Sequence, residues 1–179
     1  MSRKSKSGSK AGFIAILIIL VLLVVAIVGV CIDWIGAKTY VDSVIGGGES
    51  ETVYYKLEKL FETFKDSETE TAGLFRTMAA FAILTVILAA ATTVLSGICK
   101  VLGWKLFKFI LVVVSIVCVI CGVVSIITTF AFCDKFTVGG GFGGIVEAGT
   151  KASPYIGAWL TAIGGALAGI VGIFAAIKS

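Results

Sequence analysis

The chain has 179 residues, a net charge of +4, and a composition that is 58% hydrophobic and only 15% charged. Soluble domains are about 45–50% apolar and about a quarter charged, so a water-soluble protein of this composition would expose too much apolar surface. Histidine, the commonest general base and metal-ligating side chain, is absent, which argues against a hydrolase or a metalloenzyme.

A basic tail, residues 1–11, comes first, and we expect it to be disordered and attracted to anionic lipid. Its cations are Arg3, Lys4, Lys6 and Lys10. The apolar segment over residues 12–34 is long enough, at about 1.5 Å per residue, to cross a hydrocarbon core of about 30 Å. A cleaved signal peptide is the alternative, but this apolar core is too long for one and no small-residue cleavage motif follows it.

The loop over residues 35–72 is predicted to contain a short amphipathic helix over residues 53–65. The apolar face of that helix, at helical spacing, consists of Val53, Leu57, Leu60, Phe61 and Phe64. Such a helix either lies on the membrane surface and caps the bundle, or offers its apolar face to a partner. The acidic residues 66–71 that follow it are predicted to be extended.

Two further apolar segments follow over residues 73–99 and 106–132, joined by a basic link at residues 100–105. After a glycine-rich loop at residues 133–153, expected to be a flexible turn, the last apolar segment covers residues 154–177. Pro154 suits the first turn of a helix there. All four segments are apolar on every side, as membrane helices are.

The chain is therefore predicted to be all-α: an integral membrane four-helix bundle with a short amphipathic helix outside the membrane. The eleven acidic residues fall in or next to the loops that follow the first and third segments, whereas the tail, the link and the C-terminus carry only lysine and arginine. By the positive-inside rule, both termini and the link lie in the cytoplasm. We expect a multi-pass protein of the plasma or cell membrane.

The last apolar segment has a stripe of small residues, which let helix backbones approach closely in lipid. The stripe consists of Gly157, Thr161, Gly165, Ala168, Gly169 and Gly172. It either packs against the other segments of the same chain or joins copies in a homo-oligomer.

The five cysteines match no metal-ligand spacing and no disulfide framework. Cys31 and Cys133 both lie near the outer ends of their segments and could form a disulfide if their helices are adjacent. Cys99, beside Lys100, is a candidate for acylation. Cys118 and Cys121 lie at mid-membrane depth and are predicted to be packing residues.

The arrangement of four spans with the larger outer loop first resembles the claudin-like tetraspans, which include the amastins of kinetoplastids. The segment from Cys31 to Lys38 resembles the amastin signature of Cys, Trp, Gly and Lys, although Trp34 is shifted by one place and Val41 replaces the second cysteine. The claudin Gly-Leu-Trp with two following cysteines is absent, and claudins have strands where this first loop is predicted to be helical. The resemblance implies an architecture and does not establish a function.

No catalytic, cofactor-binding or metal-binding pattern is recognisable, and no ionisable residue falls at mid-membrane depth, where transporters and proton relays need one. The predicted partners are membrane lipids and further copies or other membrane proteins, not nucleic acid. We therefore expect a non-enzymatic protein with a structural, scaffolding or partner-contact role. A small pore-forming oligomer and an accessory subunit of a larger membrane complex are the alternatives.

Overall fold

The structure is a computed structural model that describes the backbone of residues 5–43, 49–142 and 146–178, and the side chains of residues 12–40, 50–137 and 149–178. Within these ranges the helices are α1 (Ser5–Cys31), α2 (Leu57–Phe64), α3 (Glu70–Leu102), α4 (Lys105–Phe136) and α5 (Ile156–Lys178). The strands are β1 (Asp33–Ser43), β2 (Glu49–Lys56), β3 (Val138–Phe142) and β4 (Val146–Pro154).

Four of the described helices, α1, α3, α4 and α5, are long and apolar enough to cross a membrane, which confirms the predicted number of long apolar helices. Their ends follow ordinary helix chemistry. Thr69 caps α3 by accepting a hydrogen bond from the Ala72 N–H at 3.3 Å. Gly103 ends the same helix in the left-handed conformation, with φ of 63°.

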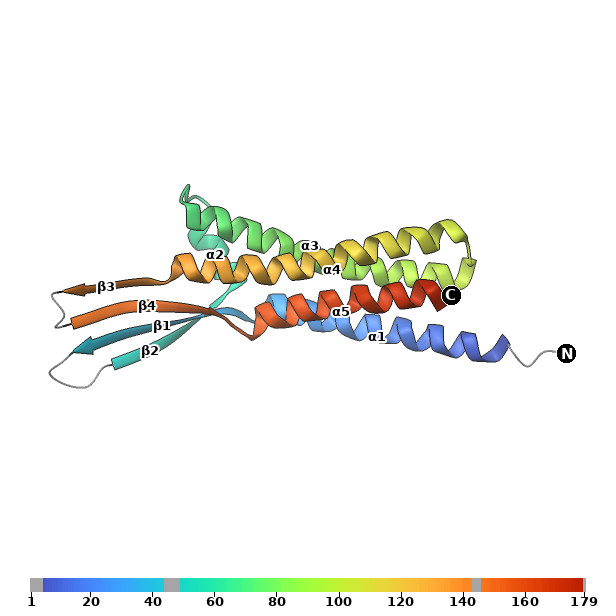
Figure 1. The fold of residues 1–179 in the computed structure, drawn as a ribbon, viewed down its shortest axis with the longest axis horizontal. Helices are drawn as coiled ribbons and strands as arrows, with labels where there is room; N and C mark the ends of the chain where they lie inside the picture. Colours follow the sequence, from blue (N-terminus) through green and yellow to red (C-terminus); the bar gives the residue numbers. More distant parts are fainter. Residues whose placement is uncertain (1–4, 44–48, 143–145, 179) are drawn as a thin grey trace.

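The four long helices form a bundle in which α5 is the central element. It packs against α1, α4 and α3, while α1 and α4 occupy opposite corners and each also packs against α3 (Figure 1). Helix α5 can touch all three neighbours because glycine and alanine make up most of its buried surface.

The predicted all-α class is wrong in one respect, because a four-stranded antiparallel sheet extends from one end of the bundle (Figure 1). The strand order is β2-β1-β4-β3. The two loops predicted to be outer loops each form a hairpin, and the hairpins join through the pairing of β1 with β4. This pairing satisfies backbone groups that neither loop could satisfy alone.

Several predicted boundaries shift because of that sheet. Residues 53–56 pair with β1 as part of β2, so the amphipathic helix covers Leu57–Phe64 and not residues 53–65. Pro154 ends β4 and does not begin a helix, and the glycine run 139–141 forms part of β3. The last of the residues expected to be extended, Glu70 and Thr71, already belong to α3.

The basic tail also differs from the prediction of disorder, because α1 begins at Ser5 and includes Lys6 and Lys10. Arg3 and Lys4 lie outside the described residues, and the side chains of Lys6 and Lys10 are not described, so the predicted lipid contacts of these four cations stay a prediction.

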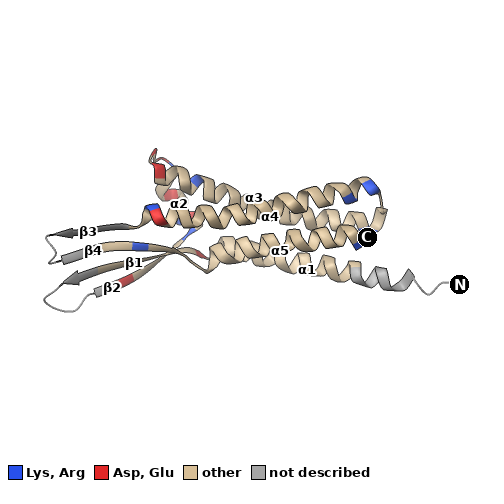
Figure 2. Cartoon of the chain, viewed as in Figure 1, with Lys and Arg blue, Asp and Glu red and all other residues tan. Residues whose placement is uncertain are grey.

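The charges separate along the bundle. The coloured acidic residues lie at the sheet end, around α2, the strands and the neighbouring helix ends, where lysine and arginine residues also lie (Figure 2). In and beside the link between α3 and α4, and at the end of α5, the described residues include the cations Lys100, Lys105, Lys108 and Lys178.

Candidate contact surface at the sheet end of the bundle

Trp34 joins the sheet to the bundle. Its side chain is fully buried, and its indole N–H donates a hydrogen bond of 2.7 Å to the Gly29 carbonyl in the last turns of α1. Its own carbonyl accepts a 2.7 Å hydrogen bond from the Tyr155 N–H, just before α5. A Cβ atom at Gly157 would lie 2.9 Å from the Trp34 ring, so the joint depends on a glycine. The sheet is therefore fixed to α1 and α5 at one point.

Helix α2 is held against the bundle by an aromatic cluster. Phe64 packs against Phe75, Phe132 and Phe136, with ring centroids 5.6, 5.7 and 6.2 Å away. Arg76 on α3 donates hydrogen bonds of 2.9 and 2.8 Å to the carbonyls of Lys65 and Ser67. Its guanidinium thus satisfies carbonyls at and just beyond the C-terminal end of α2.

These contacts correct the predicted contact face of the amphipathic helix. Leu57 and Leu60 are buried, and Phe64 is half-buried against the cluster, so three of the five predicted residues face the bundle. Val53 belongs to β2. Only Phe61, 55% exposed, keeps an open surface on the helix. The apolar face is mostly used to seat α2, because burial of leucine and phenylalanine against the helix ends removes them from solvent.

A different surface, on one face of the sheet, is open. Side chains alternate between the two faces of a strand. Lys38 and Tyr40 of β1 therefore share one face of the sheet with the residues directly opposite them on β2 and β4. Lys38 lies directly opposite Lys151 of β4, and both lysines are exposed. Two residues back along β1, Gly36 lies opposite Tyr54 of β2, whose ring packs against that of Tyr155 at a tilt of 42° with centroids 4.6 Å apart. We refer to Lys38, Tyr40, Tyr54, Lys151 and Tyr155 as the tyrosine–lysine face.

The tyrosines of this face are partly exposed, with Tyr54 at 47% and Tyr155 at 38%. Both rings pack over Gly36, where a Cβ atom would lie at ordinary van der Waals distance, 3.6 Å, from the Tyr54 ring. The electrostatic interaction with Tyr54, with a smaller effect of a hydrogen bond between the two side chains, raises the pKa of Tyr155. Tyr155 therefore stays protonated at physiological pH and can both donate and accept hydrogen bonds.

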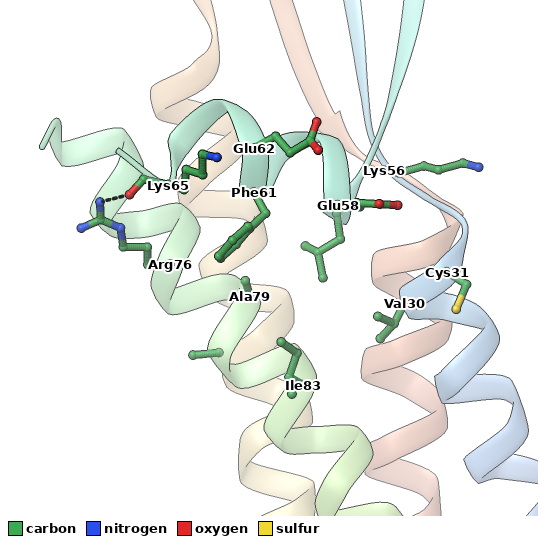
Figure 3. A pocket seen from close by; sticks show the side chains of 12 residues that line it. Val30, Cys31, Lys56, Glu58, Phe61, Glu62, Lys65, Arg76, Ala79 and Ile83 are labelled. Atoms are coloured by element: carbon green, nitrogen blue, oxygen red, sulfur yellow. Dashed lines mark hydrogen bonds between the residues drawn. The ribbon is translucent and has the colours of Figure 1, made fainter. Parts of the chain in front are cut away.

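A groove lies on another side of the same end, beneath α2 and between α1 and α3 (Figure 3). Its volume is about 870 Å³. Apolar side chains from all three helices form its floor: Val30, Leu57, Phe61, Ala79, Ala80 and Ile83. Charged side chains form its rim: Lys56, Glu58, Glu62, Lys65 and Arg76. The Cys31 thiol also lines the groove.

The structure does not bring the predicted disulfide partners together. All five cysteines are free thiols, and Cys31 and Cys133 belong to α1 and α4, which occupy opposite corners of the bundle. Cys31 is exposed, whereas Cys133 is buried beside the aromatic cluster.

The other cysteines lie in the interior. Cys99 is 1% exposed and packs with Leu111 and Ala176, a placement that withholds the thiol from an acylating enzyme. Cys118 donates its S–H to the Gly165 carbonyl at 3.3 Å, and Cys121 is buried.

All six residues of the small-residue stripe of α5 are buried. A Cβ atom at Gly157 would lie 2.7 Å from the Gly29 carbonyl oxygen of α1, and one at Gly169 would lie 2.6 Å from the Ser115 carbonyl oxygen of α4. Gly165 faces Thr85 of α3. Within the structure the stripe therefore packs the chain against itself.

Among the described residues, no group of three or more histidine, cysteine or carboxylate side chains comes together as a metal site. No model of a known protein family matches the chain. A search of curated proteins likewise finds no match. Any inference about function therefore starts from the geometry of the sheet end.

Sequence reasoning missed the tyrosine–lysine face. The β-branched and aromatic residues of Thr39-Tyr40-Val41 favour a strand, and they are the signal that could have found the face.

Proposed function

We propose that this chain is a non-enzymatic four-span membrane protein whose tyrosine–lysine face contacts an acidic surface on another membrane protein. In this proposal both termini and the link between α3 and α4 lie in the cytoplasm. The sheet and α2 lie outside. The separation of basic and acidic ends along the bundle supports this orientation.

The observation that carries the proposal is the Lys38–Lys151 pair. Like charges directly opposite on neighbouring strands destabilise a sheet, and neither ammonium group forms an ion pair with a carboxylate whose side chain the structure describes. The pair does not stabilise the fold, but it presents two neighbouring cations to an acidic partner. The flanking tyrosines add apolar area with a polar tip, a combination that protein interfaces favour.

The likeness to claudin-like tetraspans stays a proposal about architecture. Its support is that the first loop contains strands β1 and β2, whereas the earlier expectation of a helical loop had set the chain apart from claudins. No function is transferred by that likeness.

A pore-forming oligomer is the second candidate, and one observation favours it. The hydroxyls of Ser115 and Ser125 on α4 are buried without a hydrogen-bond partner among the described side chains, as they would be if water or another chain completed them. The close packing of α5 glycines against α3 and α4 counts against an open path inside one chain. Absence of dye release from liposomes at high protein density would exclude this candidate.

Purification from native membranes in mild detergent tests the contact proposal. The wild type, a Lys38→Glu/Lys151→Glu variant and a charge-conserving Lys38→Arg/Lys151→Arg variant are compared by quantitative mass spectrometry. We expect at least one membrane protein to co-purify with the wild type and the arginine variant and to be lost from the glutamate variant. The same set of proteins from all three variants would refute an electrostatic contact at this face.

A further inference from the structure

We infer that the groove beneath α2 holds a zwitterionic glycerophospholipid, with an acyl chain between α1 and α3 and the headgroup against the charged rim. This requires that the long helices span a membrane, but it does not depend on the contact role of the tyrosine–lysine face, which is tested through Lys38 and Lys151, neither of which lines the groove. The proposed contact with an acidic partner is argued without the residues that line the groove.

The floor of the groove suits a hydrocarbon chain. Phe61 of α2 is 55% exposed and Ile83 of α3 is 50% exposed. Apolar surface is therefore open both on the long helix α3 and on the short helix that covers the groove. The floor continues along α3 onto Ile87, which is 58% exposed and belongs to the lipid-facing side of the helix. A chain in the groove would thus be continuous with the surrounding bilayer. Figure 3 shows Val30 of α1 across the groove from Ala79 and Ile83 of α3.

The groove exists because α2 lies over α3 at a place where α1 and α3 pack together only modestly. Helix α1 packs far more extensively on α5 than on α3. Helix α2 contacts α3 through Leu57, Leu60 and the aromatic cluster. The space left between α1 and α3 is about 870 Å³, within the range of about 300–1,000 Å³ typical of ligand sites.

The rim carries both signs of charge, as a zwitterionic headgroup does. Arg76 is already committed to the carbonyls of Lys65 and Ser67, which leaves Lys56 or Lys65, at opposite ends of α2, to face a phosphate (Figure 3). Glu58 and Glu62 on the same rim are placed to face a choline or ethanolamine cation. A purely anionic headgroup would meet these two carboxylates unfavourably.

The position of the groove favours a lipid over a protein segment. Its lining comes from the end of α1, from α2 and from the first half of α3, where long apolar helices meet charged residues, which is the depth of lipid headgroups. An acyl chain enters it from the bilayer without leaving an apolar environment. A peptide would bring unpaired backbone groups against an apolar floor.

The unmodified full chain, reconstituted in phosphatidylcholine vesicles, tests the inference. The vesicles contain a small fraction of phosphatidylcholine with a diazirine on one acyl chain, and cross-linked peptides are mapped after irradiation. We expect labelling of the peptides that hold Val30 and residues 79–83 to exceed labelling around Ile120 of α4, which is 53% exposed and lipid-facing, by at least fivefold. Equal labelling of all lipid-facing helix surfaces would overturn the inference.

A pair of variants on one helix provides a second test. Ala80→Trp fills the groove, whereas Val94→Trp places the same side chain on a lipid-facing position of α3 that is 62% exposed and outside the groove. Native mass spectrometry in phosphatidylcholine-doped detergent should show one retained lipid on the wild type and Val94→Trp, and a loss of at least fivefold for Ala80→Trp. Equal retention by all three proteins overturns the site.

The zwitterionic headgroup is tested separately, by comparing which lipid the wild type retains. Phosphatidylglycerol retained more strongly than phosphatidylcholine by the wild type would overturn the zwitterionic assignment. Either failure leaves the tyrosine–lysine contact unaffected, because that contact is read out through Lys38 and Lys151.

Discussion

Lys38 of β1 lies directly opposite Lys151 of β4, at the pairing that joins the two hairpins of the sheet. The two strands come from loops more than a hundred positions apart in the chain, so this like-charge pair exists only in the folded protein. The pair shares its face with Tyr40 and Tyr54, and Tyr54 borders the charged residues Asp33, Lys56 and Glu58 where the sheet meets α2.

Replacing one member of this pair should stabilise the sheet. Lys151→Glu converts a repulsive cross-strand pair into an attractive one, so we expect the free energy of unfolding to rise by about 0.2–1 kcal/mol. Thermal unfolding in detergent micelles measures the change. Lys151→Arg, which keeps the repulsion, serves as the control and should leave the midpoint unchanged. A lower midpoint for Lys151→Glu would show that the pair is not repulsive in the fold.

Removal of the Trp34 indole donor should loosen the joint between sheet and bundle. Trp34→Phe leaves the Gly29 carbonyl without its 2.7 Å partner in a buried position, and we expect a loss of about 1–3 kcal/mol. Hydrogen exchange at the amides of β1 should quicken. Trp104→Phe is the matched control, since Trp104 is 61% exposed. Equal effects of the two substitutions would argue against the joint.

The central position of α5 can be tested with two glycine substitutions. A Cβ atom at Gly169 would lie 2.6 Å from a backbone oxygen of α4, whereas one at Gly97 of α3 would meet nothing within 4 Å. Gly169→Ala should therefore destabilise the bundle by about 1–3 kcal/mol, and Gly97→Ala should be neutral or stabilising by up to about 1 kcal/mol. The measurement is the thermal unfolding midpoint of both variants. An unchanged midpoint for Gly169→Ala would contradict the helix arrangement.

All five cysteines should react as free thiols, at rates that follow how exposed each thiol is to the reagent. Under native conditions in detergent, a maleimide should modify Cys31, which is exposed, much faster than the buried Cys133. After denaturation without reductant, alkylation should add five groups to the intact mass. Only three added groups would mean that two cysteines are paired, and would restore the disulfide that the structure lacks.

The sequence was sufficient to predict the long helices, because runs of twenty or more apolar residues have few alternatives to a membrane span. It was insufficient for the sheet. Val53-Tyr54-Tyr55 fits a helical apolar stripe and a strand equally well over so short a stretch, and only pairing with β1 decides between them. Glycine has a low strand propensity, so nothing local marks residues 139–141 as part of β3.

The candidate site was harder to predict than the fold. The tyrosine–lysine face draws residues from β1, β2, β4 and the start of α5, and their proximity follows from a pairing between two distant loops. The groove depends in the same way on where α2 is seated. Arg76 holds the turn after α2 through two backbone carbonyls, a contact between segments that no local pattern in the sequence marks.

The central claim, that the tyrosine–lysine face contacts an acidic partner, is tested most directly by photo-cross-linking from neighbouring positions of β2. Thr52 lies opposite Lys38 and shares its face, whereas Glu51 lies opposite Thr39 on the other face, and both are exposed. A benzophenone side chain at position 52 should give a discrete adduct in native membranes that Lys38→Glu/Lys151→Glu abolishes and the paired arginine substitutions preserve. The same probe at position 51 should give no such adduct. Adducts of equal yield from both positions, unaffected by charge reversal, would contradict the account.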